Sequence, residues 1–581
     1  MKHTQSNFLK SGCAIDLVLL AALWCIAVII VNPIGEFPLN DDWSYALTVK
    51  YLGEHLDFRP CGWTCMPFIT QALWGALFCL PRGFSFTALR FSTLTLSLAG
   101  VLGFYILMRQ VGSSRRFALM CALVLAFNPI YFALSNSFMT DVPFTTLAIF
   151  SIFFFVRYFQ TESTPSLVIA VVLAIITTLC RQLGLALPLA FTATVFLKYG
   201  FQKSRVALAL APSLLTGIIW VGFNHWMKVT GRTPAIYNKE TNKLLLILSK
   251  PWTVPLHLAH HGWNALMYTG CFLLPLLILF LPAKRQLFSR KTIKVAIGFF
   301  VLWSGARFIF KPGLMPVHGN ILDPHGIGPL LLQDAQLLSL PHVIPLPVAF
   351  WFIVTLLSLA GAAILISLTL LSDFFSPAQA EIADCGQLKR SWLFSKWPIK
   401  DRLQSVNTTV GVFFLFCALI YLAPLVINGF FDRYFITVIV FVAGFLATML
   451  PVAEWPARRW QWIAAIVLLT CSALYAVAGT RDYLAWNRVR WIALADLQQN
   501  HIPPEKIDGG LEFNGWYLYD PKYQPGGDKS DWWVIDNQYL VSFGDMPGFA
   551  EIKEYDYARW LPPSRGKIVV LKKTSNQSAS K

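Results

Sequence analysis

The chain has 581 residues, of which 56% are hydrophobic and 13% are charged, and its formal net charge is +17. Soluble domains carry about 25% charged residues, so an ordinary soluble protein is excluded. From Arg481 to the end, 13 Lys and Arg balance 13 Asp and Glu, so the positive excess lies in the apolar part of the chain. This distribution argues against nucleic-acid binding and predicts a multi-pass membrane protein with basic loops.

The apolar runs approach the roughly 20 residues that cross a bilayer as a helix. The first run is too long for the core of a signal peptide, and no small-residue cleavage site follows it, so we expect a retained helix. Hydropathy predicts about thirteen spans. They lie near 13–31, 86–108, 117–134, 142–159, 166–180, 183–199, 206–227, 262–282, 293–310, 346–372, 410–428, 433–450 and 461–478.

The loops between these spans predict the orientation of the chain. A cytosolic N-terminus puts one set of basic loops on the cytosolic side, as the positive-inside rule requires. The segment 228–261 carries five basic residues on the other side, but long loops follow the rule poorly. We expect an integral protein of a bacterial inner (plasma) membrane. The basic loops are 109–116, 198–205, 284–291, 373–409 and 458–459.

The last hundred residues read as a soluble domain. Residues 483–500 have the apolar spacing of a helix. Segments 532–543 and 567–573 predict strands, and 521–531 is a turn-rich loop. The predicted fold is therefore mainly α: a transmembrane helical bundle over 1–478, followed by a small periplasmic or extracellular α/β domain over 479–581.

Three carboxylates stand at the predicted outer ends of spans. Asp41 and Asp42 follow the first span and precede an amphipathic segment, 43–56, that is expected to lie along the membrane interface. Asp141 lies in "TDVPF" in the second outer loop. All three could simply cap helices. Burying a carboxylate at membrane depth costs free energy unless the group has a functional role or a charge partner. The alternative to helix capping is therefore that the three carboxylates face one shared cavity.

Cationic side chains stand on the same side. Arg433 lies in "GFFDRYF" and Arg181 in "LCRQLGL". A guanidinium fork suits phosphate oxygens, although each arginine could instead reach for lipid headgroups, and Asp432 could pair with Arg433. The segment 315–332, rich in Gly, Pro and His, is typical of a structured cavity loop.

Other motifs are weaker. His318 and His325 are too sparse to argue for a metal site. Cys61 and Cys65 could form a disulfide or stay free. No phosphate-binding glycine loop or nucleotide-binding unit is present, so we expect neither a cofactor nor a nucleotide-sugar donor.

These residues together resemble the GT-C glycosyltransferases that use polyprenyl-phosphate sugars. The chain is similar to the protein O-mannosyltransferases and the lipid A aminoarabinose transferases. The resemblance is carried by the Asp41-Asp42 pair, the helical segment 64–94, "TDVPF" and "DRYF", with the soluble domain placed outside the cytosol.

The resemblance implies a membrane enzyme of the cell envelope. It would transfer a sugar from a polyprenyl-phosphate donor to a hydroxyl of a lipid, glycan or protein acceptor on the non-cytosolic side, with inversion and an Asp as general base. A transporter or flippase of a lipid-linked saccharide, or a non-catalytic assembly subunit, is the competing interpretation. The implied catalytic residues are Asp41, Asp42 and Asp141, with the choice between the first two left open. The implied phosphate ligands are Arg433, Arg181 and Arg59, and the implied cavity residues are Tyr45, Tyr434, His318 and Asn320.

Overall fold

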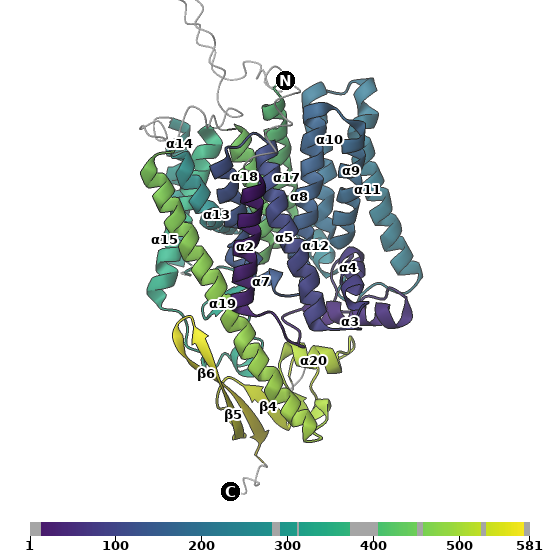
Figure 1. Ribbon diagram of the computed structural model, residues 1–581, viewed down its shortest axis with the longest axis vertical. Coiled ribbons are helices and arrows are strands. Elements are labelled where there is room, and N and C mark those ends of the chain that lie inside the picture. The colour runs from purple at the N-terminus through teal and green to yellow at the C-terminus, as the bar shows by residue number, and fades with distance from the viewer. Residues whose placement is uncertain are drawn as a thin grey trace, which may run out of the picture.

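The computed structural model describes residues 13–281, 291–310, 313–371, 405–449, 457–524 and 530–574. Helices form a bundle that makes up most of the molecule, and a small sheet lies beyond one end of it (Figure 1). We call this end of the bundle the sheet end. The chain begins at the opposite end, which we call the N-terminal end. This arrangement confirms the predicted helical bundle with a small C-terminal sheet.

Long apolar helices build the bundle. Ten described helices are long and apolar enough to cross a membrane, or eleven if the bent pair α6 and α7 counts as one span. Each of the thirteen predicted spans coincides with a helix, and two of these, α9 and α14, fall outside that count. The bundle helices are α2 (Cys13–Val31), α5 (Phe86–Gln110), α6 (Arg115–Ala126), α7 (Pro129–Ser135), α8 (Asp141–Thr161), α9 (Thr164–Cys180), α10 (Ala186–Tyr199), α11 (Lys203–Val229), α13 (Val254–Leu277), α14 (Lys291–Phe310), α15 (Val348–Leu371), α17 (Val406–Asn428), α18 (Phe435–Met449) and α19 (Arg459–Gln499).

The predicted span 117–134 is bent by 61° between α6 and α7. Pro129 has no N–H with which to continue the helix. The side chain of Asn128 accepts the N–H groups of Ile130 and Tyr131 at 3.1 and 3.2 Å, and so caps a new helix. The bend matters for the site because the chain after α7 carries Phe138, which contacts one of the predicted acids.

Short elements lie at the sheet end. The predicted interfacial segment forms α3 (Asp42–His55), which is followed by α4 (Ile69–Cys79), and both lie at this end in Figure 1. The 3₁₀ turns η1 (Gln182–Leu185) and η6 (Asp432–Tyr434) precede α10 and α18. The remaining short elements are α12 (Lys239–Leu248), β1 (Leu322–Asp323), β2 (Gly326–Ile327) and the π-helical turn η5 (Gln333–Leu337).

The C-terminal part is joined to the bundle by one continuous helix. The predicted domain boundary at 478/479 falls inside α19, which is 41 residues long. A four-stranded sheet follows in the order β3-β4-β6-β5, with β3 and β4 parallel and the other pairs antiparallel. Its elements are β3 (Ile507–Asp508), α20 (Leu511–Leu518), β4 (Tyr539–Ser542), β5 (Phe549–Trp560) and β6 (Pro563–Lys573).

The predicted strand 532–543 is mostly not a strand. Only residues 539–542 form β4, because Trp532 and Trp533 turn away and pack in a separate apolar cluster around Trp43. The predicted strand 567–573 is part of β6. Its partner β5 was not predicted because most of its side chains are exposed, so it lacks the regular apolar alternation of a half-buried strand.

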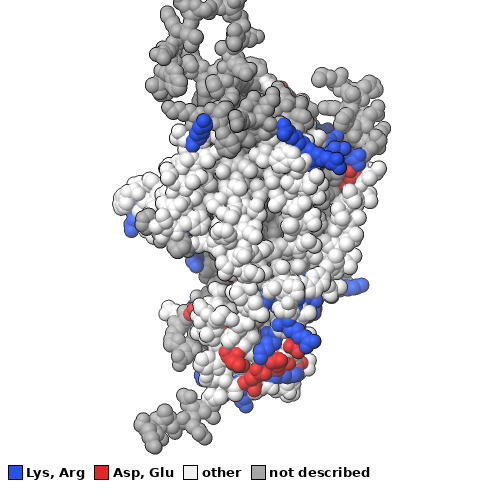
Figure 2. All heavy atoms as spheres, turned by 90° about the vertical axis from the view of Figure 1, so that its left-hand side faces the viewer, with Lys and Arg blue, Asp and Glu red and all other residues white. Residues whose placement is uncertain are grey.

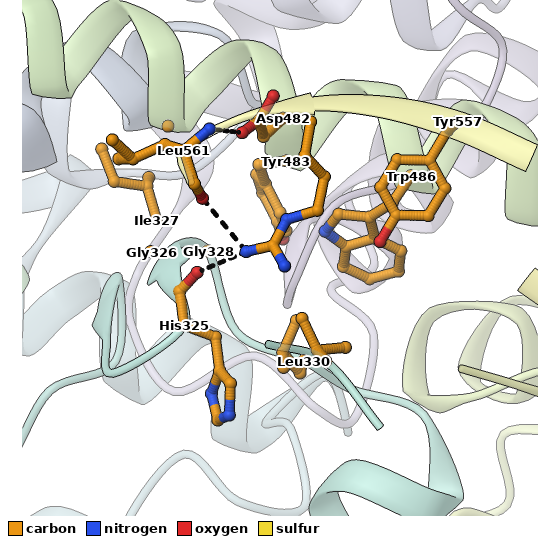
Figure 3. Close-up of a pocket in the computed structure, with 13 residues that line it drawn as sticks. His325, Gly326, Ile327, Gly328, Leu330, Asp482, Tyr483, Trp486, Tyr557 and Leu561 are labelled. Atoms are coloured by element: carbon orange, nitrogen blue, oxygen red, sulfur yellow. Dashed lines mark hydrogen bonds between the residues drawn. The ribbon is translucent and has the colours of Figure 1, made fainter. Parts of the chain in front are cut away.

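Buried polar contacts close the joint between α19, the hairpin β5–β6 and the loop before α15 (Figure 3). The Asp482 carboxylate accepts the N–H of Leu561 at 2.8 Å. The Arg559 guanidinium donates to the carbonyls of Ile344, His325 and Leu561 at 3.0, 3.2 and 3.0 Å. The cavity among these residues measures about 20 Å³, which is room for about one water. The joint therefore fixes the sheet to the bundle.

Charged residues gather at the two ends of the face in Figure 2, and the band between them is almost entirely uncharged. The basic loop 109–116 lies at the N-terminal end, because Arg115 pairs with Asp16 in the first turn of α2 at 2.7 Å. The predicted basic loops lie outside the described residues over 284–290 and 373–404, as do residues 525–529 of the predicted turn-rich loop.

Candidate functional site

The two adjacent acids lie where the chain turns from α2 into α3. Asn40 adopts a left-handed conformation with φ 55°, which turns the backbone sharply before the acids. Asp42 is the first residue of α3 and is 1% exposed. Its carboxylate accepts the N–H of Leu39 at 2.6 Å and the N–H of Phe138 at 3.1 Å. Asp42 therefore ties this loop to the segment between α7 and α8.

The environment of Asp42 also changes its acidity. Burial raises the pKa of its carboxyl to about 7, while the Arg90 guanidinium and the two backbone N–H groups act in the opposite direction. Burial is therefore the main cause of the raised pKa, and the carboxylate of Glu512 adds to it.

Asp41 faces a different environment. Its side chain is 22% exposed. One carboxylate oxygen accepts the indole N–H of Trp63 at 3.0 Å, and the other lies 3.5 Å from Nη1 of Arg433. Asp41 is thus a part-exposed carboxylate beside a guanidinium, whereas Asp42 is enclosed by backbone.

Two buried arginines lie near Asp41. Arg181 follows the end of α9 and donates a short hydrogen bond to Asp141 at the start of α8. Its guanidinium stacks 4.7 Å from the ring centre of Tyr434, and that of Arg433 lies 5.9 Å from the same ring. Both arginines are less than 10% exposed. Helix breaks at η1 and η6 bring these residues together from distant parts of the sequence.

Two polar atoms in this group have no hydrogen-bond partner among the described residues. They are Oδ2 of Asp141 and Nε of Arg433, and both are buried. Buried polar atoms are usually paired, and an unpaired one in a native structure calls for a specific reason. The pair supplies one acceptor and one donor of opposite charge, which suits a polar ligand that carries an anionic group.

The predicted cavity residues lie around this group to different degrees. Tyr45 is 2% exposed, and its ring is tilted by 30° against that of Phe68, with ring centres 4.9 Å apart. Asn320 accepts the side-chain N–H of Asn40 at 3.4 Å, and so contacts the loop of residues 39–42, which we call the acid loop. Arg59 is different: its side chain is 58% exposed, and its charge partner is Asp57 at 3.5 Å.

Asp432 does not make the predicted pair with its neighbour Arg433. Its carboxylate accepts the N–H groups of Ile321 and Leu322, the second at 2.7 Å. This anchors the loop 315–332 to η6, so the sequence-predicted cavity loop is held in place by a buried carboxylate. The neighbouring guanidinium remains directed toward Asp41.

One histidine cluster could hold a metal ion. His260, His261 and His318 have ring nitrogens within 4.8 Å of one another. His318 was predicted as a cavity residue, whereas the sequence did not single out the other two. Neutral imidazoles are good ligands for zinc. Cys61 and Cys65, the predicted candidates for a disulfide, are both free thiols.

Residues that sequence reasoning missed also shape the site. Trp63 bonds to Asp41, and Glu512 of α20 accepts the backbone N–H of Asn40 at 3.0 Å. Arg490 of α19 pairs with Glu512 at 2.9 Å, and both side chains are 0% exposed. No local pattern marks these residues, because Asn40 and Glu512 are 472 positions apart in the sequence.

Residues 65–223 match the model of a family described as dolichyl-phosphate-mannose-protein mannosyltransferase. This part of the chain, about a quarter of its length, is similar to that family of membrane glycosyltransferases. The matched range contains α4, α5 and α8, and with them Asp141 and Arg181. The resemblance predicted from the sequence is therefore confirmed.

Two solved structures are also similar to the chain over most of its length. ArnT from Cupriavidus metallidurans bound to undecaprenyl phosphate is 14% identical, with a TM-score of 0.37, and the match covers 97% of this chain and 99% of ArnT. The apo state of the same protein is 14% identical with a TM-score of 0.35, covering 85% and 83%. No curated protein matches at a significant level. The likenesses to solved structures are weak, so the family match over residues 65–223 is the comparison that bears on function.

Proposed function

We propose that this protein is a GT-C glycosyltransferase, which transfers a sugar from a polyprenyl-phosphate donor to an acceptor hydroxyl on the non-cytosolic side of the membrane, with inversion. The observation that carries the proposal is the part-exposed carboxylate of Asp41 beside the buried guanidinium of Arg433, 3.5 Å apart. A base and a phosphate-binding cation at this separation are the two groups that such a transfer needs.

The donor phosphate is assigned to Arg433 and Arg181. A guanidinium binds phosphate oxygens through a planar fork, and burial strengthens its interaction with an anion. Asp141 holds Arg181 in place, and Tyr434 stacks beside both arginines. Arg59 is a weaker candidate because it is exposed and paired with Asp57.

Asp41 is assigned the role of general base. It takes the proton of the acceptor hydroxyl while the acceptor oxygen attacks the anomeric carbon of the sugar. The bond from that carbon to the phosphate oxygen breaks, and the polyprenyl phosphate leaves as an anion held by the arginines. Attack opposite the leaving group inverts the anomeric carbon. Asp42 is assigned a supporting role, because both of its oxygens already accept backbone N–H groups.

The acceptor is assigned to the region around the acid loop. Tyr45, Tyr434, Asn320 and His318 are the candidate lining residues, and the acceptor is a hydroxyl of a lipid, glycan or protein in the cell envelope.

The test is transfer by purified protein supplied with a panel of polyprenyl-phosphate sugars and, as controls, nucleotide sugars. We expect a product from one lipid-linked donor only. Asp41→Asn keeps the size of the side chain but cannot take a proton, so the rate should fall about 10²–10⁴-fold while donor binding survives. A flippase would move lipid-linked saccharide across vesicles without forming a new glycosidic bond. Parental rates in Asp41→Asn, Asp42→Asn and Asp141→Asn alike would refute the proposal.

A further inference from the structure

Four aromatic rings from two parts of the chain pack together beside Asp41. They are Trp43 of α3, Trp63 of the following loop, and Tyr519 and Trp533 of the C-terminal part, and we call them the aromatic cluster. Trp63 lies edge-on to Trp533 with ring centres 5.3 Å apart, and its ring centre is 6.2 and 6.4 Å from those of Trp43 and Tyr519. The C-terminal part therefore supplies two of these three rings around the Trp63 indole.

The cluster is tightly held. Trp43 is 0% exposed, and α20 packs against α3 at this point. A side chain larger than hydrogen at Gly515 of α20 would collide with the Trp43 ring. The indole N–H of Trp43 is buried without a partner among the described residues. The corresponding N–H of Trp63 donates to Asp41 at 3.0 Å.

This hydrogen bond decides which way the Asp41 carboxylate faces. The two oxygens of Asp41 have different partners, the indole N–H at 3.0 Å and Arg433 at 3.5 Å. Opposite charges at this separation in a low-dielectric environment attract strongly. Without the indole N–H, the carboxylate is free to turn both oxygens toward Arg433. It would then occupy the cation that the donor phosphate needs and present no oxygen to the acceptor.

We propose that Trp63 is a positioning residue that holds the Asp41 carboxylate apart from Arg433, and that the C-terminal part sets this position through Tyr519 and Trp533. The proposal rests on the proposed function of Asp41 as general base. It explains why a folded C-terminal part sits directly over the acid loop: without it, one side of the Trp63 indole has no packing partner.

The test is kinetic. Trp63→Phe keeps an aromatic ring but removes the N–H. We expect kcat to fall about ten- to hundredfold, because small misplacements of a reacting group cost rates of this size. The dissociation constant of the donor should stay within about twofold of the parental value.

A second measurement separates positioning from packing. In an Asp41→Asn background, Trp63→Phe should cause no additional loss, because it acts through the carboxylate that is already gone. Equal losses in the two backgrounds would mean that Trp63 only packs, and would overturn the proposal. So would a parental rate for Trp63→Phe.

Two further variants provide a second test of the hydrogen bond and a matched control. Benzothienylalanine at position 63 has the shape of tryptophan but sulfur in place of the N–H, so it tests the bond even if Trp63→Phe folds poorly, and it should show the same loss of kcat. Trp516→Phe is the matched control, since Trp516 packs the C-terminal part against Phe84 and Phe86. It should keep the parental rate. If the parental protein transfers no sugar from any donor, the proposed function fails. If it does and these variants behave otherwise, only the role of Trp63 fails.

Discussion

Adjacent residues in this protein have opposite surroundings. Asp41 and Asp42 differ only in position, yet one is part-exposed beside a guanidinium and the other is buried under two backbone N–H groups. The difference arises because Asp41 stands at the N-cap position of α3, without a capping hydrogen bond from its side chain, and Asp42 begins the helix, so their side chains leave the helix start in different directions. The role of each carboxylate therefore depends more on the groups that surround it in the folded protein than on its being an aspartate.

Arg433 tests how the donor phosphate is recognised. In Arg433→Lys the charge remains, but an ammonium cannot form the planar two-point contact of a guanidinium. We expect donor affinity to fall at least tenfold, with normal expression and folding. The measurement is donor binding to purified protein, with Arg59→Lys as the control because that exposed side chain pairs with Asp57. Parental donor affinity in Arg433→Lys would remove this residue from the phosphate site.

Asp42 predicts a pH dependence of stability. Its pKa in the folded protein is about 7, against an ordinary value of 3.8, so the folded state keeps a proton that the unfolded state releases. The contribution of this group is full below about pH 4, is lost as the pH rises to about 7, and is constant above that. Between pH 5 and pH 8 it amounts to on the order of 2 kcal/mol.

Thermal unfolding in detergent at pH 5 and pH 8 measures this contribution. The parental protein should lose more stability between these pH values than Asp42→Asn, which has no proton to release. Equal pH dependence in both proteins would show that Asp42 titrates normally.

At the scale of elements, the acid loop is held by helices that come from the far end of the sequence. Arg490 of α19 and Glu512 of α20 form a fully buried ion pair, and Glu512 also accepts the N–H of Asn40. Two nitrogens of Arg490 have no other partner among the described residues. The guanidinium therefore depends on Glu512 for compensation of its charge.

Removing one member of this pair should lower the free energy of unfolding. In Glu512→Gln the side chain can still accept the N–H of Asn40, but the buried Arg490 guanidinium loses its charge partner, which typically costs about 3–5 kcal/mol of stability. The double variant Arg490→Met, Glu512→Gln should be more stable than Glu512→Gln alone. Unfolding midpoints of purified protein measure both. Glu554→Gln is the control, because the exposed pair of Glu554 with Lys567 contributes about 1 kcal/mol or less.

The sequence predicted elements better than contacts. Hydropathy located the long helices of the bundle, because a helix in lipid is marked by an uninterrupted apolar run. It missed the break at Pro129, which depends on the cap formed by Asn128, and it extended β4 over Trp532 and Trp533, which join another cluster. The acids and arginines stood out as charges in apolar surroundings. Trp63 and Glu512 did not, because their roles exist only once distant segments meet.

At the scale of the whole molecule, the two ends of the bundle differ in the segments that they carry. The acid loop, Asn320 and the C-terminal sheet lie at the sheet end, and the basic loop 109–116 lies at the other. From the positive-inside rule, we propose that the second end is cytosolic.

Cysteine labelling in a cysteine-free background tests this orientation. Single cysteines at Asn320 and Asp545 should react with a membrane-impermeant reagent added to the non-cytosolic side, and a cysteine at Arg116 should react only from the cytosolic side. Labelling of Asn320 or Asp545 from the cytosol would reverse the orientation and remove the proposed site from the outer face.

The length of α19 has a consequence for the membrane itself. At about 1.5 Å per residue its 41 residues span roughly 60 Å, about twice the hydrocarbon thickness of a bilayer. A helix adjusts to a thinner or thicker bilayer by tilting, and a stiff rod carries that tilt to its far end. Near the far end of α19, Arg490 forms its ion pair with Glu512, and Glu512 accepts the backbone N–H of Asn40 in the acid loop. The rate of sugar transfer should therefore change with the acyl-chain length of the surrounding lipid. The measurement is the rate of one preparation in vesicles of graded bilayer thickness.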